Sequence, residues 1–294
     1  MELADQQPRE TSIDGEVVIR TSVLRAAFAS RLGRTVVETK FHTAPIKIAK
    51  AFPLEGQLGI IVMDVSPGLL SGDRYALEWT CGESSHVMIT NQSYTKVHPS
   101  KPPEDSSMQQ TFELAENAIV EHMPEPVMLY KDAAFRNNTR VNLSQGSVWL
   151  QAEVLCPGRS LRGERFGYRS YRNTISVYYG EELIFFQRQQ IEPERHALAA
   201  AGCWEELTHS ATFYVFSDRL DGSHLELLQQ KLDRFVTPEG HNLVSGASLT
   251  HRFGIAVSAM STAAWPLQQL MRELWEAVRA SLLEKQPLRF LQGS

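Results

Sequence analysis

The chain has 294 residues, with 29 Lys and Arg against 34 Asp and Glu, so its formal net charge is −5 when histidine is neutral. With 43% hydrophobic and 21% charged residues, it has the composition of a folded globular protein and not of a disordered chain. The mild acidity argues against broad binding to phosphate backbones, so no nucleic-acid partner is expected.

Membrane and secretion signals are not evident in the sequence. No apolar run approaches the roughly 18 residues of a membrane-spanning helix. Residues 1–16 are polar and acidic, unlike a secretory signal, so we expect a cytoplasmic protein that does not associate with membranes. Cys81, Cys156 and Cys203 have spacings that predict neither a disulfide framework nor a metal-binding knuckle.

Alternation of apolar and polar residues dominates from about residue 16 to residue 190 and predicts a long series of β-strands. Tyr75, Leu77 and Trp79, for example, share one face of such a strand. A glycine at position 180 separates two strand patterns and predicts a hairpin, so antiparallel neighbours are expected. The sequence therefore predicts a mainly β fold, a single large antiparallel β domain that is either a β-sandwich or β-helix-like. No strand–helix–strand rhythm supports a doubly wound nucleotide-binding fold.

Helical periodicity appears only in the C-terminal part of the chain. Apolar residues at helical spacing predict two α-helices, one over residues 224–235 and a C-terminal one over 265–283, and more weakly a third over 194–207. Strand patterns separate these segments, so we interpret residues 1–294 as one domain with helices added to a β body. Residues 1–15 are predicted to be a disordered tail. Residues 98–107, rich in proline and charge, are predicted to form a mobile loop.

Local catalytic motifs are missing from the sequence. It contains no G-x-x-x-x-G-K-[ST] phosphate cradle, no G-x-G-x-x-G, no H-E-x-x-H and no G-x-S-x-G elbow. Nine histidines are scattered without an H-x-H or H-x-x-x-H pair, so no tight metal site is predicted. An enzyme becomes less probable, although triads assembled from distant residues leave no local trace.

Four polar clusters interrupt the apolar pattern, at residues 67–74, 89–97, 129–133 and 151–166. The glycines of the first cluster predict a turn in which Asp73 bonds backbone N–H groups. The last cluster predicts a turn held by an Arg–Glu ion pair. The residues expected to make these two turns are Gly68, Gly72, Gly158, Arg159, Gly163 and Glu164.

Glu153 lies on a mixed strand face, which it shares with Trp149, Gln151 and Leu155. Two interpretations remain open from the pattern alone. The carboxylate is either solvated, or it lines a polar passage between sheets.

The ordered set of motifs resembles the urease accessory protein family UreD, also called UreH. The motifs are PGLLSGD, ITNQSYTKVHPS, LYKDAAF, EVLCPGRSLRGERF and, after the C-terminal helix, PLRF. The resemblance extends from about Leu24 to Phe290. The sequence departs from the family pattern at Leu69, where a second glycine is usual, and at Phe290, where tryptophan is usual.

The resemblance implies a urease maturation factor that is not an enzyme. Such a factor is a chaperone-like scaffold that binds apo-urease, joins a UreF-type accessory protein and through it recruits a UreG-type GTPase, within a dimeric hetero-complex. It implies that nickel is delivered for assembly of the urease metallocentre, and that GTP is bound by the partner. No cofactor is expected to be tightly bound, and nickel is expected only in transit.

We therefore hypothesise that weak oxygen ligands inside the fold line a nickel passage. Ni²⁺ prefers imidazole and thiolate for tight binding, so carboxylate, amide and hydroxyl groups favour transfer over retention. The candidates, taken from the matching motifs, are Asp73, Thr90, Gln92, Asp132 and Glu153.

Two other functions remain open from the sequence. One is a β-fold hydrolase that uses separated carboxylates such as Asp132 and Glu164 as acid and base. The other is a β-sandwich binding module for carbohydrate or peptide, served by exposed aromatic residues such as Trp204 and Trp265.

Overall fold

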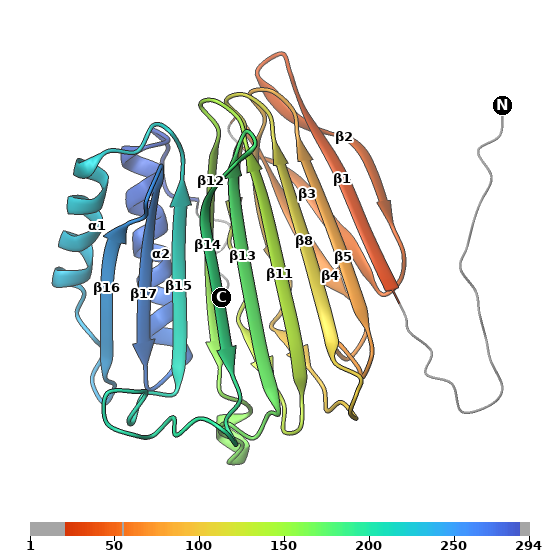
Figure 1. The fold of residues 1–294 in the computed structure, drawn as a ribbon. Coiled ribbons are helices and arrows are strands. Elements are labelled where there is room, and N and C mark those ends of the chain that lie inside the picture. The colour runs from red at the N-terminus through yellow and green to blue at the C-terminus, as the bar shows by residue number, and fades with distance from the viewer. Residues whose placement is uncertain (1–20, 55, 289–294) are drawn as a thin grey trace, which may run out of the picture.

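Two large β-sheets lie face to face and make up most of the molecule (Figure 1). The computed structural model describes residues 21–54 and 56–288. The seven strands of sheet A, in spatial order, are β14 (Glu182–Ile191), β13 (Ser170–Tyr179), β11 (Ala134–Leu143), β8 (Ser106–Leu114), β5 (Arg74–Cys81), β1 (Thr21–Arg31) and β2 (Arg34–His42).

Sheet B has ten strands and carries both α-helices at one end. Its main path is β16 (Leu243–Leu249), β17 (Gly254–Ser261), β15 (His209–Phe216), β12 (Val148–Cys156), β9 (Ile119–His122), β6 (His86–Asn91), β4 (Gln57–Asp64) and β3 (Ile46–Leu54). Two short strands, β7 (Thr95–Val97) and β10 (Val127–Leu129), pair beside β12.

The chain coils between the two sheets like a β-solenoid. From β4 to β13 it returns repeatedly to each sheet, and each return adds a parallel neighbour: β4, β6, β9 and β12 in sheet B, and β5, β8, β11 and β13 in sheet A. Antiparallel pairs lie toward the sheet ends, including the hairpin of β13 and β14 around Gly180 that the sequence predicts. The mainly β prediction is confirmed. The expectation of antiparallel neighbours is wrong for the centre of both sheets, because alternation along a strand reports which faces are buried and carries no information on strand direction.

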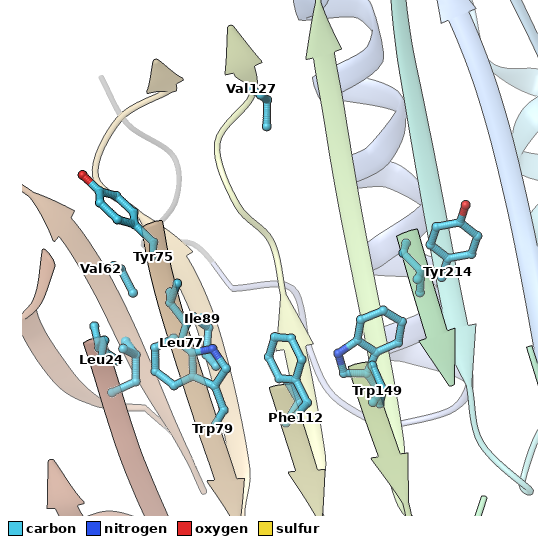
Figure 2. Close-up of a cluster of buried hydrophobic side chains, with 14 of the residues drawn as sticks. Leu24, Val62, Tyr75, Leu77, Trp79, Ile89, Phe112, Val127, Trp149 and Tyr214 are labelled. Carbon is cyan, nitrogen blue, oxygen red and sulfur yellow. The ribbon is translucent and has the colours of Figure 1, made fainter. Parts of the chain in front are cut away.

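Apolar side chains fill the space between the sheets. Trp79, Phe112 and Trp149 form a row across them, with ring centroids 6.5 Å and 5.9 Å apart (Figure 2). Strand β12 is buried along its whole length. Its residues Trp149 and Leu155 face this first core, and its alternate residues face a second core under the helices.

The two predicted helices are confirmed as α1 (Gly222–Arg234) and α2 (Ala264–Ser281). Asp221 caps α1 by accepting hydrogen bonds from the backbone N–H groups of Ser223 and His224, which satisfies two donors that the first turn leaves unpaired. Helix α2 packs its apolar stripe against β12, β15 and β17. Segment 194–207 forms turns and bends, so the weaker helix prediction is wrong. Gly202 and Glu205 adopt φ of 79° and 51° there, which a right-handed helix cannot accommodate.

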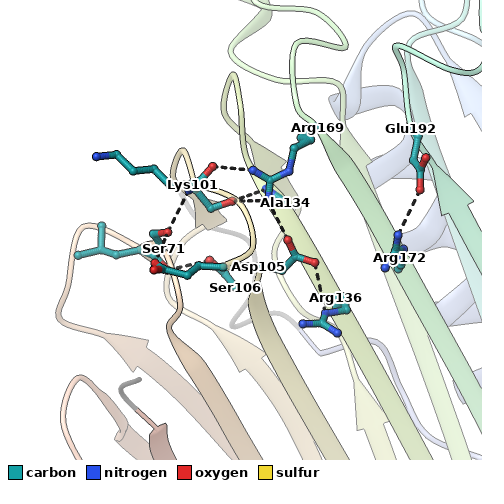
Figure 3. Close-up of polar contacts among 12 residues, drawn as sticks. Ser71, Lys101, Asp105, Ser106, Ala134, Arg136, Arg169, Arg172 and Glu192 are labelled. Atoms are coloured by element: carbon teal, nitrogen blue, oxygen red, sulfur yellow. Dashed lines mark hydrogen bonds and ion pairs between the residues drawn. The ribbon is translucent and has the colours of Figure 1, made fainter. Parts of the chain in front are cut away.

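The loop predicted over residues 98–107 is fastened to the sheet at both ends. Arg169 donates to the backbone oxygen of Ser100 (2.7 Å) and to Asp105 (2.8 Å), and Arg136 lies 3.5 Å from the same aspartate (Figure 3). Strand β8 already begins at Ser106, so the irregular part is shorter than predicted. The predicted tail at residues 1–15 lies outside the described residues.

The two predicted glycine turns are present. In the first, the carboxylate of Asp73 accepts a hydrogen bond from the backbone N–H of Leu70 at 2.8 Å, as the sequence predicts. In the second, Nε of Arg159 donates to Glu164 at 2.7 Å, and a second guanidinium N–H of Arg159 donates to the other carboxylate oxygen. The bidentate pair and a short 3₁₀ helix (Ser160–Arg162) hold this turn.

The glycines of these turns are needed for two different reasons. Gly68 has φ 133°, and a Cβ there would lie 2.4 Å from the carbonyl oxygen of Lys96. Gly158 has φ 136°, and its Cβ would lie 2.7 Å from the carbonyl oxygen of Glu164. Gly72 and Gly163 have φ near 77°, where glycine is favoured by its backbone conformation.

A buried charge cluster anchors the C-terminal end of α2 to sheet B. The side chain of Glu121 on β9 is fully buried and accepts from Trp275 and Arg279 of α2. His86 on β6 lies 2.6 Å from the same carboxylate, and Gln57 on β4 accepts from Arg279 at 3.1 Å. Burial opposes ionisation of Glu121, but the His86 hydrogen bond and then the charge of Arg279 outweigh it and lower its pKa.

Removing one partner of this cluster should be far more damaging than removing both. We expect Arg279→Met to lower the free energy of unfolding by about 3–5 kcal/mol, because the ionised Glu121 is left buried with fewer partners. The double substitution Glu121→Gln with Arg279→Met should recover a large part of that loss. Chemical denaturation measures both. The exposed Arg234→Met at the end of α1 is the control, and an equal loss in control and variant would contradict this account.

Substitution of Gly158 tests whether close contact with the neighbouring backbone determines the conformation of the second turn. We expect Gly158→Ala to destabilise the fold by about 1–3 kcal/mol, because it combines an unfavourable φ with a clash against backbone. Gly163→Ala, where no atom lies within 4 Å of the added Cβ, should cost about 1 kcal/mol. The comparison requires only the two unfolding curves. Equal losses of unfolding free energy in the two variants would show that the contact with the Glu164 carbonyl oxygen does not contribute to stability.

Candidate functional site

A cavity of about 90 Å³, lined by both apolar and polar side chains, lies between the two sheets at the edge of the first apolar core. A water molecule needs roughly 10–15 Å³ of such space, so the cavity has room for several waters or a hydrated ion. Strands of both sheets line it, together with the segments after β4 and β6. Its polar lining consists of Asp64, Ser66, Tyr75, Asn91, Gln92, Ser93, Tyr94, Thr95, Lys96, Gln110, His122, Glu125, Asn137 and Glu153.

Glu153 is the deepest carboxylate of this cavity, and only 8% of the residue is exposed. It projects from β12 toward sheet A, where the Tyr171 hydroxyl (2.5 Å) and the Asn173 amide (2.9 Å) donate to one oxygen. The Asn137 amide donates to the other oxygen at 3.3 Å. Burial raises the pKa of Glu153, and the hydrogen bonds from Tyr171 and Asn137 offset this only in part. Glu153 is therefore an interior group between the sheets and does not lie on the outer surface.

Asn137 presents an unused acceptor beside this carboxylate. Its amide nitrogen donates to Glu153 and, at 3.2 Å, to the side-chain oxygen of Asn173. Its own Oδ1 is buried and has no hydrogen-bond partner among the residues that the structure describes. A buried oxygen left unpaired costs about 1–3 kcal/mol, so this position favours a guest that accepts a lone pair. Glu153 and Asn137 together offer two oxygen ligands of different charge.

His122 lines the cavity without adding positive charge. It is buried on β9, and its Nδ1 lies 2.8 Å from Oε1 of Gln151. Burial lowers the pKa of His122 to about 4, with the Gln151 hydrogen bond opposing the shift. The ring is therefore neutral near pH 7, and a cation in the cavity meets no imidazolium.

The five residues proposed for a passage fall into three groups. Gln92 and Glu153 both line the cavity. Thr90 lies on the opposite face of sheet B and lines a groove beneath α2. Asp73 and Asp132 occupy turns and are not in the cavity lining: Asp73 caps the first turn, and Asp132, at φ 61°, accepts from the backbone N–H of Ser100 through its carbonyl.

Asn137, which lines the cavity, and the two other donors to Glu153 were not identified from the sequence. Asn137 and Asn173 sit at inward-facing positions of β11 and β13 and are both buried, and Tyr171 shares the face of Asn173. The sequence feature that could have identified the two asparagines is their position on the same strand face as Val and Ile residues that are buried. Without knowledge that the two strands are adjacent, that signal does not connect them to Glu153.

The residues named for a hydrolase and for a binding module make contacts elsewhere in the fold. Glu164 is held by Arg159 in its turn, and neither Glu164 nor Asp132 lines the cavity between the sheets or the groove beneath α2. Trp204 packs at right angles on Phe166, with centroids 5.4 Å apart. Trp265 is 48% exposed and contacts the ring of His241.

The described residues do not form a cluster of side chains suited to binding a metal ion tightly. Within residues 21–54 and 56–288, no three His, Cys, Asp or Glu side chains are grouped so that they could hold a metal ion. In the same part of the chain, neither helix combines the length and apolarity required to cross a bilayer.

Comparison with known proteins finds matches to one family over nearly the whole chain. The model of the UreD urease accessory protein family matches residues 20–291. Urease accessory protein UreD of Acetivibrio thermocellus is 31% identical over 244 residues, which cover 82% of this chain and 90% of that protein. UreH of Helicobacter hepaticus is 27% identical over 82% of this chain and 92% of its own length, and UreD of Bacillus cereus is 23% identical over 90% and 96%. This chain therefore belongs to the UreD family of urease accessory proteins.

Proposed function

We propose that this protein is a non-catalytic scaffold of urease maturation that passes Ni²⁺ through the cavity between its two sheets. In this proposal it binds apo-urease and recruits a UreF-type protein and, through it, a UreG-type GTPase, which binds the GTP. Membership of the UreD family supports the maturation role. The observation that carries the nickel step is the buried carboxylate of Glu153 beside the unpaired oxygen of Asn137.

The chemistry of these groups suits transfer better than storage. Carboxylate and amide oxygens bind Ni²⁺ more weakly than imidazole or thiolate. Burial raises the pKa of Glu153, which favours its protonated form and so opposes tight binding of a cation at this carboxylate. The neutral ring of His122 offers a nitrogen nearby without a repelling charge. A cation can therefore enter the cavity, be held briefly and leave.

Replacing Glu153 tests this function directly. Glu153→Gln keeps the size of the side chain and an oxygen that can accept from Tyr171, but it removes the charge that attracts a cation. We expect the nickel content of co-expressed urease to fall roughly tenfold, the scale seen when groups around a metal site are altered. The measurement is nickel per urease active site, alongside size-exclusion analysis of the accessory complex.

A matched control at another carboxylate distinguishes the loss of a charge in the cavity from the loss of a charge elsewhere on the protein. Glu113 on β8 is an exposed carboxylate that accepts from Asn142, and Glu113→Gln should leave the nickel content unchanged. Normal urease metallation with Glu153→Gln would remove Glu153 from the passage. Loss of complex assembly in that variant would instead indicate a structural role.

A further inference from the structure

The interior cavity meets a second hollow at Glu125. A groove of about 80 Å³ lies between sheet B and α2, on the far side of β6 and β12 from the cavity. Figure 1 shows α2 behind β15 and β17 on this side of the sheet. Pro124 and Glu125 line both the cavity and the groove. Thr90, Gln268 and Arg272 also line the groove.

The two residues that line both spaces, Pro124 and Glu125, belong to no strand. Glu125 is half-buried in the segment between β9 and β10, where prolines on both sides restrict its backbone. Gln268 of α2 donates to Glu125 at 3.5 Å, and its own oxygen accepts from the Tyr94 hydroxyl at 3.3 Å. Tyr94 lines the cavity. A chain of rotatable side chains thus connects the wall of the cavity to α2.

We propose that the cavity has a second opening beneath α2, where Glu125 binds the passing divalent cation and Arg272 competes with that cation for the carboxylate. This inference rests on the proposed function and adds to it an exit or entry point and the residues that control it.

The charges around Glu125 fit this role. Glu125 and Arg272 both line the groove, so the guanidinium is the nearby positive charge that a passing cation meets there. Burial raises the pKa of Glu125, and the positive charge of Arg272 opposes this shift. Arg272 is exposed on α2 and can move into solvent when a cation arrives, since two positive charges at one carboxylate repel each other. Thr90 and Gln268 bring neutral oxygens to the lining of the same groove, and hard or borderline divalent cations accept ligands of this kind.

This location also accounts for the position of Thr90. The hydroxyl lies on the far face of sheet B from Gln92 and Glu153, so the three cannot line one straight channel between the sheets. A route that crosses the edge of the cavity at Glu125 brings all three onto one path.

The test is a double-substitution cycle in the full accessory complex, with Ni²⁺ supplied alone at limiting concentration to apo-urease. We expect Glu125→Gln to slow nickel incorporation roughly tenfold. Arg272→Gln should speed it, because the competing charge is gone. In the Glu125→Gln background, Arg272→Gln should have no effect. Glu276→Gln, which removes a carboxylate elsewhere on α2, is the control and should leave the rate unchanged.

The outcomes separate this inference from the proposed function. If Glu153→Gln slows incorporation while Glu125→Gln and Arg272→Gln leave it unchanged, the passage exists and its opening lies elsewhere. If all three leave it unchanged, the nickel passage itself is refuted. Should Glu125→Gln prevent complex assembly, the surface substitution Arg272→Gln decides alone: a faster rate supports the opening, and an unchanged or slower rate overturns it.

Discussion

Burial of the Glu153 carboxylate between two apolar sheets is the constraint on which the proposed mechanism depends. A carboxyl group is costly to remove from water, and here the cost is met by donors from two strands of the facing sheet, Tyr171 and Asn173 on β13 and Asn137 on β11. These donors face Glu153 only because the solenoid brings β11 and β13 side by side, in parallel register, opposite β12. The fold therefore places a polar site against the apolar core between the sheets.

The other buried carboxylate, Glu121, has the opposite character. Its partners include the guanidinium of Arg279 and the ring of His86, its pKa is lowered, and its contacts join three strands to α2. Glu121 is thus a structural group, paired with a buried guanidinium of the protein itself. The donors to Glu153 are the neutral groups of Tyr171, Asn137 and Asn173, and burial raises its pKa, so its charge when ionised is left for a guest to compensate. The difference between these two sites separates an anchoring function from a binding one.

The sequence predicted those parts of the fold that depend on local periodicity. The β character, the β13–β14 hairpin, both helices and the two glycine turns follow from spacing and turn chemistry that act over a few residues. The parallel direction of the central strands could not be predicted, because period-two alternation is the same in both directions. Segment 194–207 was misjudged because alanine content favours a helix, while the left-handed residues Gly202 and Glu205 interrupt it.

The candidate site was predictable only in part, for the same reason. Glu153 stood out as a charged residue in a strand of apolar neighbours, but Asn137 and Asn173 are remote from it in sequence and become its partners through sheet pairing. Thr90 and Gln92, two residues apart, do not lie along one path between the sheets: Gln92 follows the end of β6 into the cavity, and Thr90 faces α2. Only the three-dimensional arrangement distinguishes them.

Diffraction at the nickel absorption edge, on crystals of the accessory complex soaked with Ni²⁺, would test the central claim most directly. The account predicts an anomalous peak between the sheets, within ligand distance of a Glu153 carboxylate oxygen and of Oδ1 of Asn137. Nickel found solely on the outer surface, with the inter-sheet cavity free of anomalous density, would contradict it.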